Sequence, residues 1–116
     1  MTLQEFRVKM AEYRRSVDEE ARYLKDSYLA LDRLRALYTQ LDSNERQMAD
    51  QVLGEWALSN DEGTRFDALA LIGDLRVRTA THALQELARR LDSSTSPGAP
   101  YELKKVNRLL EALRER

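Results

Sequence analysis

Few side chains in this sequence combine the residue types and spacing that catalysis needs. The one histidine, His82, stands opposite the apolar positions of its predicted helix, so we expect it to face solvent. A single exposed histidine makes neither a metal site nor a catalytic triad. Cysteine is absent, which excludes thiol catalysis, thiolate metal sites and disulfide bonds.

Carboxylates and glycines give no stronger catalytic pattern. The acidic pairs Glu19–Glu20 and Asp61–Glu62 are neighbours in sequence and suit helix capping better than acid and base roles. The glycines are isolated at positions 54, 63, 73 and 98, so no glycine-rich phosphate loop is present. We therefore expect a protein that is not an enzyme and that holds neither a metal nor a cofactor.

Two further side chains have both a structural and a binding interpretation. Trp56 could anchor a partner, but it shares a helical stripe with Val52 and Leu53, which favours a place in the core. Arg65 could meet a ligand, but it follows an acidic turn, which favours an ion pair with Asp61, with Glu62 or with a neighbouring hairpin.

Charge is distributed unevenly along the chain, although the net charge is only −1. Residues 42–75 carry eight acidic and two basic side chains, and residues 76–116 carry five acidic and nine basic ones. The acidic middle is a candidate surface for a basic partner; the alternative is that these are ordinary solvated helix faces whose charges attract each other in the fold. The candidate partner-binding residues are Glu55, Asp61, Glu62, Asp67 and Asp74.

The basic end also suggests nucleic acid as a weaker alternative. Dedicated nucleic-acid binders usually have a high pI and aromatic residues among the basic ones. Here the pI is about 5.9, and the basic residues alternate with predicted core positions. We therefore do not expect a dedicated nucleic-acid site.

The elements that position these residues are predicted to be helices. The chain has 116 residues, of which 42% are hydrophobic and 34% charged, enough for a single domain with one core and unlike a disordered or membrane protein. Residues 1–7 lack the order of charges and apolar residues found in a signal peptide, so we expect a cytoplasmic location.

Apolar residues recur every three or four positions through most of the chain, and no segment alternates with the period of a strand. Residues 1–41 form one long amphipathic segment, either a single helix or one broken near Ser16 or Asp26, where capping residues occur. Residues 43–75 and 79–115 are each predicted to form a helical hairpin, the second with a flexible Ser/Pro/Gly loop at 92–100.

The turn and helix over residues 60–73 resemble part of a HEAT repeat. Leu58, Asp61, Arg65, Ala68, Ile72 and Gly73 fall on the positions where that family has a leucine, an acidic turn, an arginine, small residues and a final Leu-Gly. The turn is about one residue shorter than usual and lacks the family's prolines. The resemblance covers residues 44–115 as degenerate repeats, and it implies antiparallel hairpins stacked as a short solenoid.

These observations predict a protein-protein interaction module, with an immunity-like or regulatory protein that covers a basic partner as the sharper version. One alternative is a homodimeric scaffold, because the stripe over residues 3–41 is long enough to leave apolar surface for a second copy. The other is weak nucleic-acid binding through the basic C-terminal segment.

Overall fold

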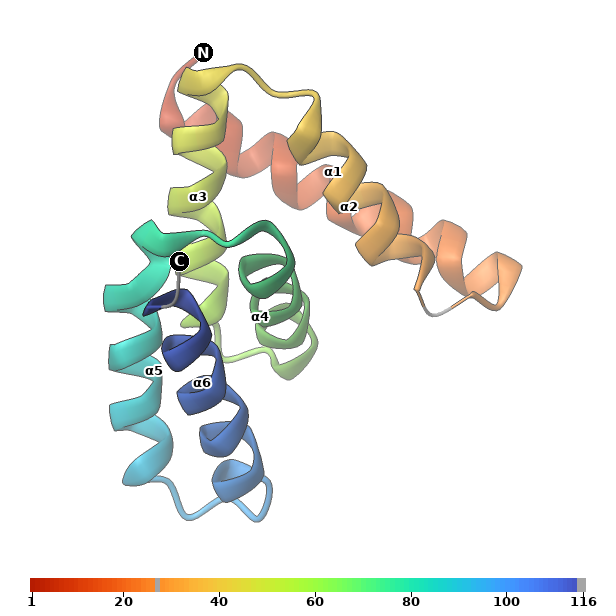
Figure 1. Ribbon diagram of the computed structural model, residues 1–116. Coiled ribbons are helices and arrows are strands. Elements are labelled where there is room, and N and C mark those ends of the chain that lie inside the picture. Colours follow the sequence, from red (N-terminus) through yellow and green to blue (C-terminus); the bar gives the residue numbers. More distant parts are fainter. Residues whose placement is uncertain (27, 115–116) are drawn as a thin grey trace. The chain divides into compact units, whose positions relative to one another are not determined.

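The computed structural model describes residues 1–26 and 28–114, and within them the fold is all-α, as the sequence predicted. The helices in chain order are α1 (Leu3–Leu24), α2 (Leu29–Thr39), α3 (Ser43–Ala57), α4 (Glu62–Leu75), the 3-10 helix η1 (Arg78–Ala80), α5 (Thr81–Asp92) and α6 (Ala99–Arg114) (Figure 1). The chain forms two compact units, Met1–Val52 and Leu53–Arg116, each of which is described separately. No helix in the described residues is both long and apolar enough to cross a membrane.

The first unit begins with a helical hairpin, so the N-terminal segment is two helices and not one. α1 runs unbroken through Ser16, and it ends where Lys25 adopts a left-handed conformation with φ of 56°. The Asp26 carboxylate then accepts a hydrogen bond from the backbone N–H of Tyr28 at 3.0 Å. Of the two predicted break points, the one near Asp26 is observed; the next residue, Ser27, lies outside the described residues.

α1 and α2 lie side by side (Figure 1), and part of the predicted stripe is buried in this unit. Arg33 forms an ion pair with Glu20 at 2.9 Å across the hairpin. The buried side chains of α1 and α2 recur at helical spacing: Phe6, Met10, Val17, Ala21, Ala30 and Leu34. Leu24 and Tyr28, predicted to continue the stripe, are exposed because the chain reverses there and no neighbouring helix covers them.

A polar contact fastens the end of α2 to α3 within the same unit. The Tyr38 hydroxyl donates to Asp50 Oδ1 at 2.8 Å, and the Arg46 guanidinium lies 5.7 Å from the centre of the Tyr38 ring. Burial, followed by this hydrogen bond to a carboxylate, raises the pKa of Tyr38 to about 12. The fold therefore favours the neutral phenol.

In the second unit, local signals set both ends of α4. The Asp61 side chain accepts from the backbone N–H of Thr64 at 2.9 Å, which is an N-cap contact. Arg76 ends the helix in a left-handed conformation, and its N–H returns to the carbonyl of Gly73. The short helix η1, which the sequence did not predict, then leads into α5.

α5 and α6 pack against each other and are joined by residues 93–98 (Figure 1). The predicted loop extended to residue 100, but Ala99 and Pro100 already belong to α6. Proline suits the first turn of a helix because the N–H that it lacks would have no partner inside the helix. The core of this unit is apolar and includes Leu69, Ile72, Leu84 and Leu87, which belong to the apolar positions that recur at helical spacing in the sequence. Among the described residues, no polar or charged side chain is buried.

α4 and α6 run side by side in the same direction. Arg65, near the start of α4, contacts Glu102, near the start of α6, and further along Gly73 faces Leu109. A Cβ atom at position 73 would lie 3.2 Å from Leu109 Cδ1, so glycine permits this close approach. The absence of a side chain at this position therefore lets α6 approach α4 closely.

We predict that the tyrosine titration step near pH 12 is absent from Tyr38→Phe. In Asp50→Asn the acceptor is neutral, so the step is expected to move to lower pH. Because the pKa of Tyr38 is raised on folding, its contribution to the unfolding free energy is complete below the unfolded value near 10 and declines as the pH rises through about 12. Ultraviolet absorbance titration of wild type and the two variants measures the pKa of Tyr38. A wild-type titration curve that neither substitution alters would contradict the assignment.

Candidate functional site

A groove of about 710 Å³ lies in the second unit between α4, the end of α5, the following loop and the start of α6. Its apolar lining includes Leu69, Leu87 and Leu91. Two exposed rings also line it, Phe66 from α4 with 53% of its surface exposed and Tyr101 from α6 with 72%. Exposed aromatic residues beside an apolar lining are typical of surfaces that bind another molecule.

An ion pair between Arg65 and Glu102 holds the two walls of the groove together. Arg65 Nε donates to Glu102 Oε1 at 2.7 Å, and Arg65 Nη2 donates to Oε2 at 3.2 Å. The two side chains are only 18% and 19% exposed, and Arg65 Nη1 also donates to the carbonyl of Ser59. The hydrogen bonds to Glu102 raise the pKa of Arg65 further above its ordinary value. This is the pairing with a neighbouring hairpin that the sequence favoured as one possibility.

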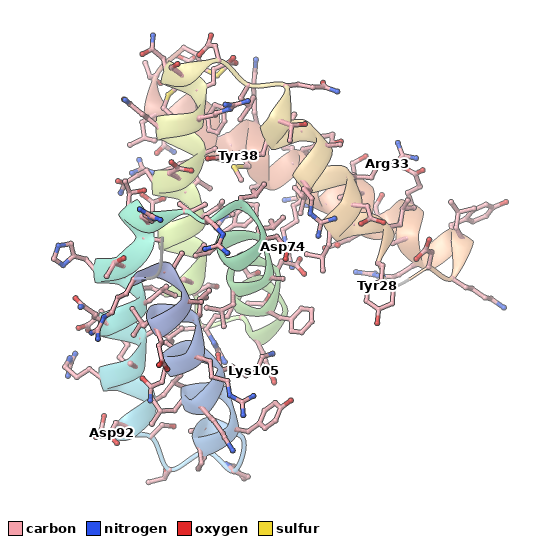
Figure 2. All side chains as sticks on the ribbon, in the orientation of Figure 1. Tyr28, Arg33, Tyr38, Asp74, Asp92 and Lys105 are labelled. Atoms are coloured by element: carbon pink, nitrogen blue, oxygen red, sulfur yellow. The ribbon has the colours of Figure 1, made fainter. Side chains whose placement is uncertain are left out.

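Lys105 is the charged group in the groove whose arrangement most suggests binding. Its ammonium nitrogen lies 4.9 Å from the centre of the Phe66 ring and 5.8 Å from that of Tyr101 (Figure 2 labels Lys105). None of the described carboxylates forms an ion pair with it. The rings therefore hold a cation in place while leaving it available to an acidic group.

Arg90 lies at another part of the groove and is already engaged. It donates to Glu86 at 3.1 Å and, from Nη1, to the carbonyl of Leu58 at 3.4 Å. Hydrogen bonds from Arg89 and Arg90 lower the pKa of Glu86 to about 2. Arg90 thus ties α5 to the turn before α4, and Lys105 is the better candidate for contact with a bound group.

The acidic residues predicted from the sequence are distributed over several places. Asp61 caps α4, Glu62 lines the groove, and Glu55 is half-buried on α3. Asp67 and Asp74 are seven residues apart on α4, which places them two turns apart on the same helix face. The structure therefore brings together Asp67 and Asp74 but not the whole predicted set.

The remaining sequence candidates have surface positions or structural contacts. His82 is exposed, as expected, and Trp56 is half-buried. No group of three or more histidine, cysteine or acidic side chains in the described part of the chain is arranged to hold a metal ion. Sequence reasoning missed the groove because Phe66 comes from α4, whereas Tyr101 and Lys105 come from α6. The one local signal was the spacing of four residues between Tyr101 and Lys105, which places both on one face of that helix.

No protein-family model matches this chain, no curated protein matches its sequence, and no solved structure matches its fold. The likeness to HEAT repeats therefore rests on the residues of the turn and helix over positions 58–73 alone.

We predict that Glu102→Gln lowers the unfolding free energy by about 1–3 kcal/mol, because it leaves a half-buried arginine charge without its carboxylate. Glu111→Gln is the matched control: Glu111 is exposed on the same helix, and its loss changes stability by less than about 0.5 kcal/mol. Urea denaturation followed by circular dichroism compares the two. Equal midpoints for the two variants would show that the pair does not hold α4 against α6.

Proposed function

We propose that this chain is a non-enzymatic protein-protein interaction module that binds a basic partner through the acidic outer face of α4, as an immunity-like or regulatory protein would. The observation that carries the proposal is the stripe Gly63, Asp67, Ala70 and Asp74, whose spacing of four, three and four residues keeps it on one side of α4. Asp74 is exposed and Asp67 is partly exposed, and the short side chains of Gly63 and Ala70 add little bulk beside them.

The distribution of polar groups supports a binding role over a catalytic one. All ionisable side chains of the described residues lie at least partly in solvent, and no buried side-chain polar atom among them lacks a hydrogen-bond partner. Catalytic groups usually acquire their properties from burial and desolvation. Complementary charge on a solvent-facing helix instead speeds association and selects the partner.

A stacked-hairpin arrangement would make the acidic face of α4 part of a larger surface. In a HEAT-like arrangement the second helices of successive hairpins run parallel, and α4 and α6 run parallel here. If α3–α4 and α5–α6 are two degenerate repeats, the outer faces of α4 and α6 form one continuous surface, with carboxylates on α4 and the basic residues Lys104, Lys105 and Arg108 on α6. A partner with both charges would then span both helices.

Nucleic-acid binding receives less support from the same surface. Tyr101 and Phe66 beside Lys105 do provide rings next to a cation, as proteins that bind single strands do. However, Glu62 and Glu102 line the same groove, and their charges oppose a continuous phosphate backbone.

The test compares wild type with the double variant Asp67→Asn, Asp74→Asn, and with Glu12→Gln, Glu19→Gln, which removes two exposed charges from α1. Asp61 is left intact because its loss would weaken the start of α4. At about 0.15 M salt, a basic protein bound by wild type and by the α1 variant is expected to be lost from the α4 variant. Proteins encoded by neighbouring reading frames are the first defined probes, followed by cell extract.

The result that contradicts the proposal is equal capture of every bound protein by all three chains. Loss from both double variants would indicate a general charge effect and would also argue against the α4 face.

A further inference from the structure

The large apolar side chains that the described residues leave exposed are concentrated in two places. Outside the N-terminal Met1 and the partly exposed Val8, they lie at the tip of the α1–α2 hairpin and on the rim of the α4–α6 groove: Tyr23, Leu24, Tyr28, Phe66 and Tyr101. Each of these five is more than half exposed. Clusters of exposed apolar side chains mark interaction sites more often than isolated ones do.

The hairpin tip presents its apolar groups in a defined turn. The backbone N–H groups of Lys25 and Asp26 return to the carbonyls of Arg22 and Ala21 at 3.3 and 3.0 Å. Lys25 holds a left-handed conformation, which costs a non-glycine residue about 1 kcal/mol. The Asp26 carboxylate fixes the N–H of Tyr28, and Tyr28 extends from the hairpin in Figure 2. The tip therefore displays apolar side chains next to an exposed carboxylate.

The groove has the complementary arrangement. It offers an apolar lining with Leu87 and Leu91, two rings at the rim, and the Lys105 ammonium, with which no described carboxylate forms an ion pair. An occupant that suits it carries an apolar side chain for the lining and a carboxylate for Lys105. Glu62 on the same rim suits an occupant that also carries a basic group, and the tip has one in Lys25.

We propose that the α1–α2 hairpin tip of one copy of this chain inserts into the α4–α6 groove of a second copy. Leu24 and Tyr28 pack between Phe66 and Tyr101, and Asp26 forms an ion pair with Lys105. This contact goes beyond the proposed binding of a basic partner, because it uses neither Asp67 nor Asp74.

The symmetry of this contact differs from that of an ordinary dimer. Tip and groove are different surfaces, so each copy that uses its groove still has an unoccupied tip, and the copies form rings or open chains. This also distinguishes the contact from pairing through the apolar stripe of residues 3–41, which would bring identical surfaces together.

The test uses two variants that each destroy one half of the contact. The tip variant is Leu24→Ser with Tyr28→Ser, and the groove variant is Phe66→Ser with Lys105→Glu; Val8→Ser removes an exposed apolar group elsewhere and is the control. Sedimentation velocity is measured from roughly 10 µM to roughly 1 mM, which spans the dissociation constants of weak interfaces. Circular dichroism checks that every chain is folded.

Wild type and the Val8 control are expected to sediment faster as concentration rises, while the tip variant alone and the groove variant alone stay monomeric. An equal mixture of the two variants is expected to form a dimer and nothing larger, because only one intact tip and one intact groove remain per pair. A monomeric wild type, self-association of either variant alone, or a mixture that stays monomeric would each overturn the proposal.

A charge exchange tests the predicted ion pair. Asp26→Lys alone and Lys105→Glu alone are expected to weaken association about tenfold or more, and one chain with both substitutions is expected to regain it. Asp26→Asn keeps an acceptor for the Tyr28 N–H but removes the charge, and it is expected to weaken association as well. If Asp26→Asn and Lys105→Glu each associate as tightly as wild type, Asp26 does not form an ion pair with Lys105. Because Asp67 and Asp74 are unchanged throughout, failure here is separable from failure of the proposed binding of a basic partner.

Discussion

The arrangement of the second unit depends on the ion pair between Arg65 and Glu102. Two hydrogen bonds join residues 37 positions apart, in a site where both side chains are less than one-fifth exposed. A planar guanidinium on a carboxylate fixes direction as well as distance, so the pair sets how α6 lies along α4. Phe66 and Lys105 follow these two residues on the same helices, and their contact depends on that register. The groove is thus a consequence of one polar contact above an apolar core.

The apolar core stabilises the fold but does little to fix how the helices are oriented against each other. In the described residues it contains aliphatic side chains, alanines, Phe6 and Met10, without a buried polar group. Such cores tolerate exchange of similar side chains, and they fix a unique arrangement less strictly than polar contacts do. In the second unit, the close approach of helices at Gly73 supplies a further constraint. In the first unit, the hydrogen bond between Tyr38 and Asp50 does so. The polar and charged side chains of the described residues therefore lie at or near the surface.

Much of the fold, and little of the candidate site, could be predicted from the sequence. Periodicity alone located the helices and the buried positions Leu69, Ile72, Leu84 and Leu87, because a helix repeats every 3.6 residues whatever it packs against. The sequence left a break near Ser16 and one near Asp26 as alternatives, because the observed reversal uses a left-handed lysine where glycine is usual. The groove depends on contacts between α4 and α6, and nothing within either helix indicates that Lys105 meets Phe66. The Asp61 carboxylate caps α4, the role that the acidic turn favoured, and its contact with a partner stays a prediction.

The most direct measurement is the proton NMR shift of the Lys105 side-chain methylenes, because a proton above an aromatic ring is shifted upfield. With Lys105 Nζ 4.9 Å from the Phe66 ring, the account predicts an upfield shift in wild type that disappears in Phe66→Leu and is reduced in Glu102→Gln, in which α4 and α6 lose their main polar contact. Methylene shifts that match those of an exposed lysine and are the same in all three proteins would contradict it.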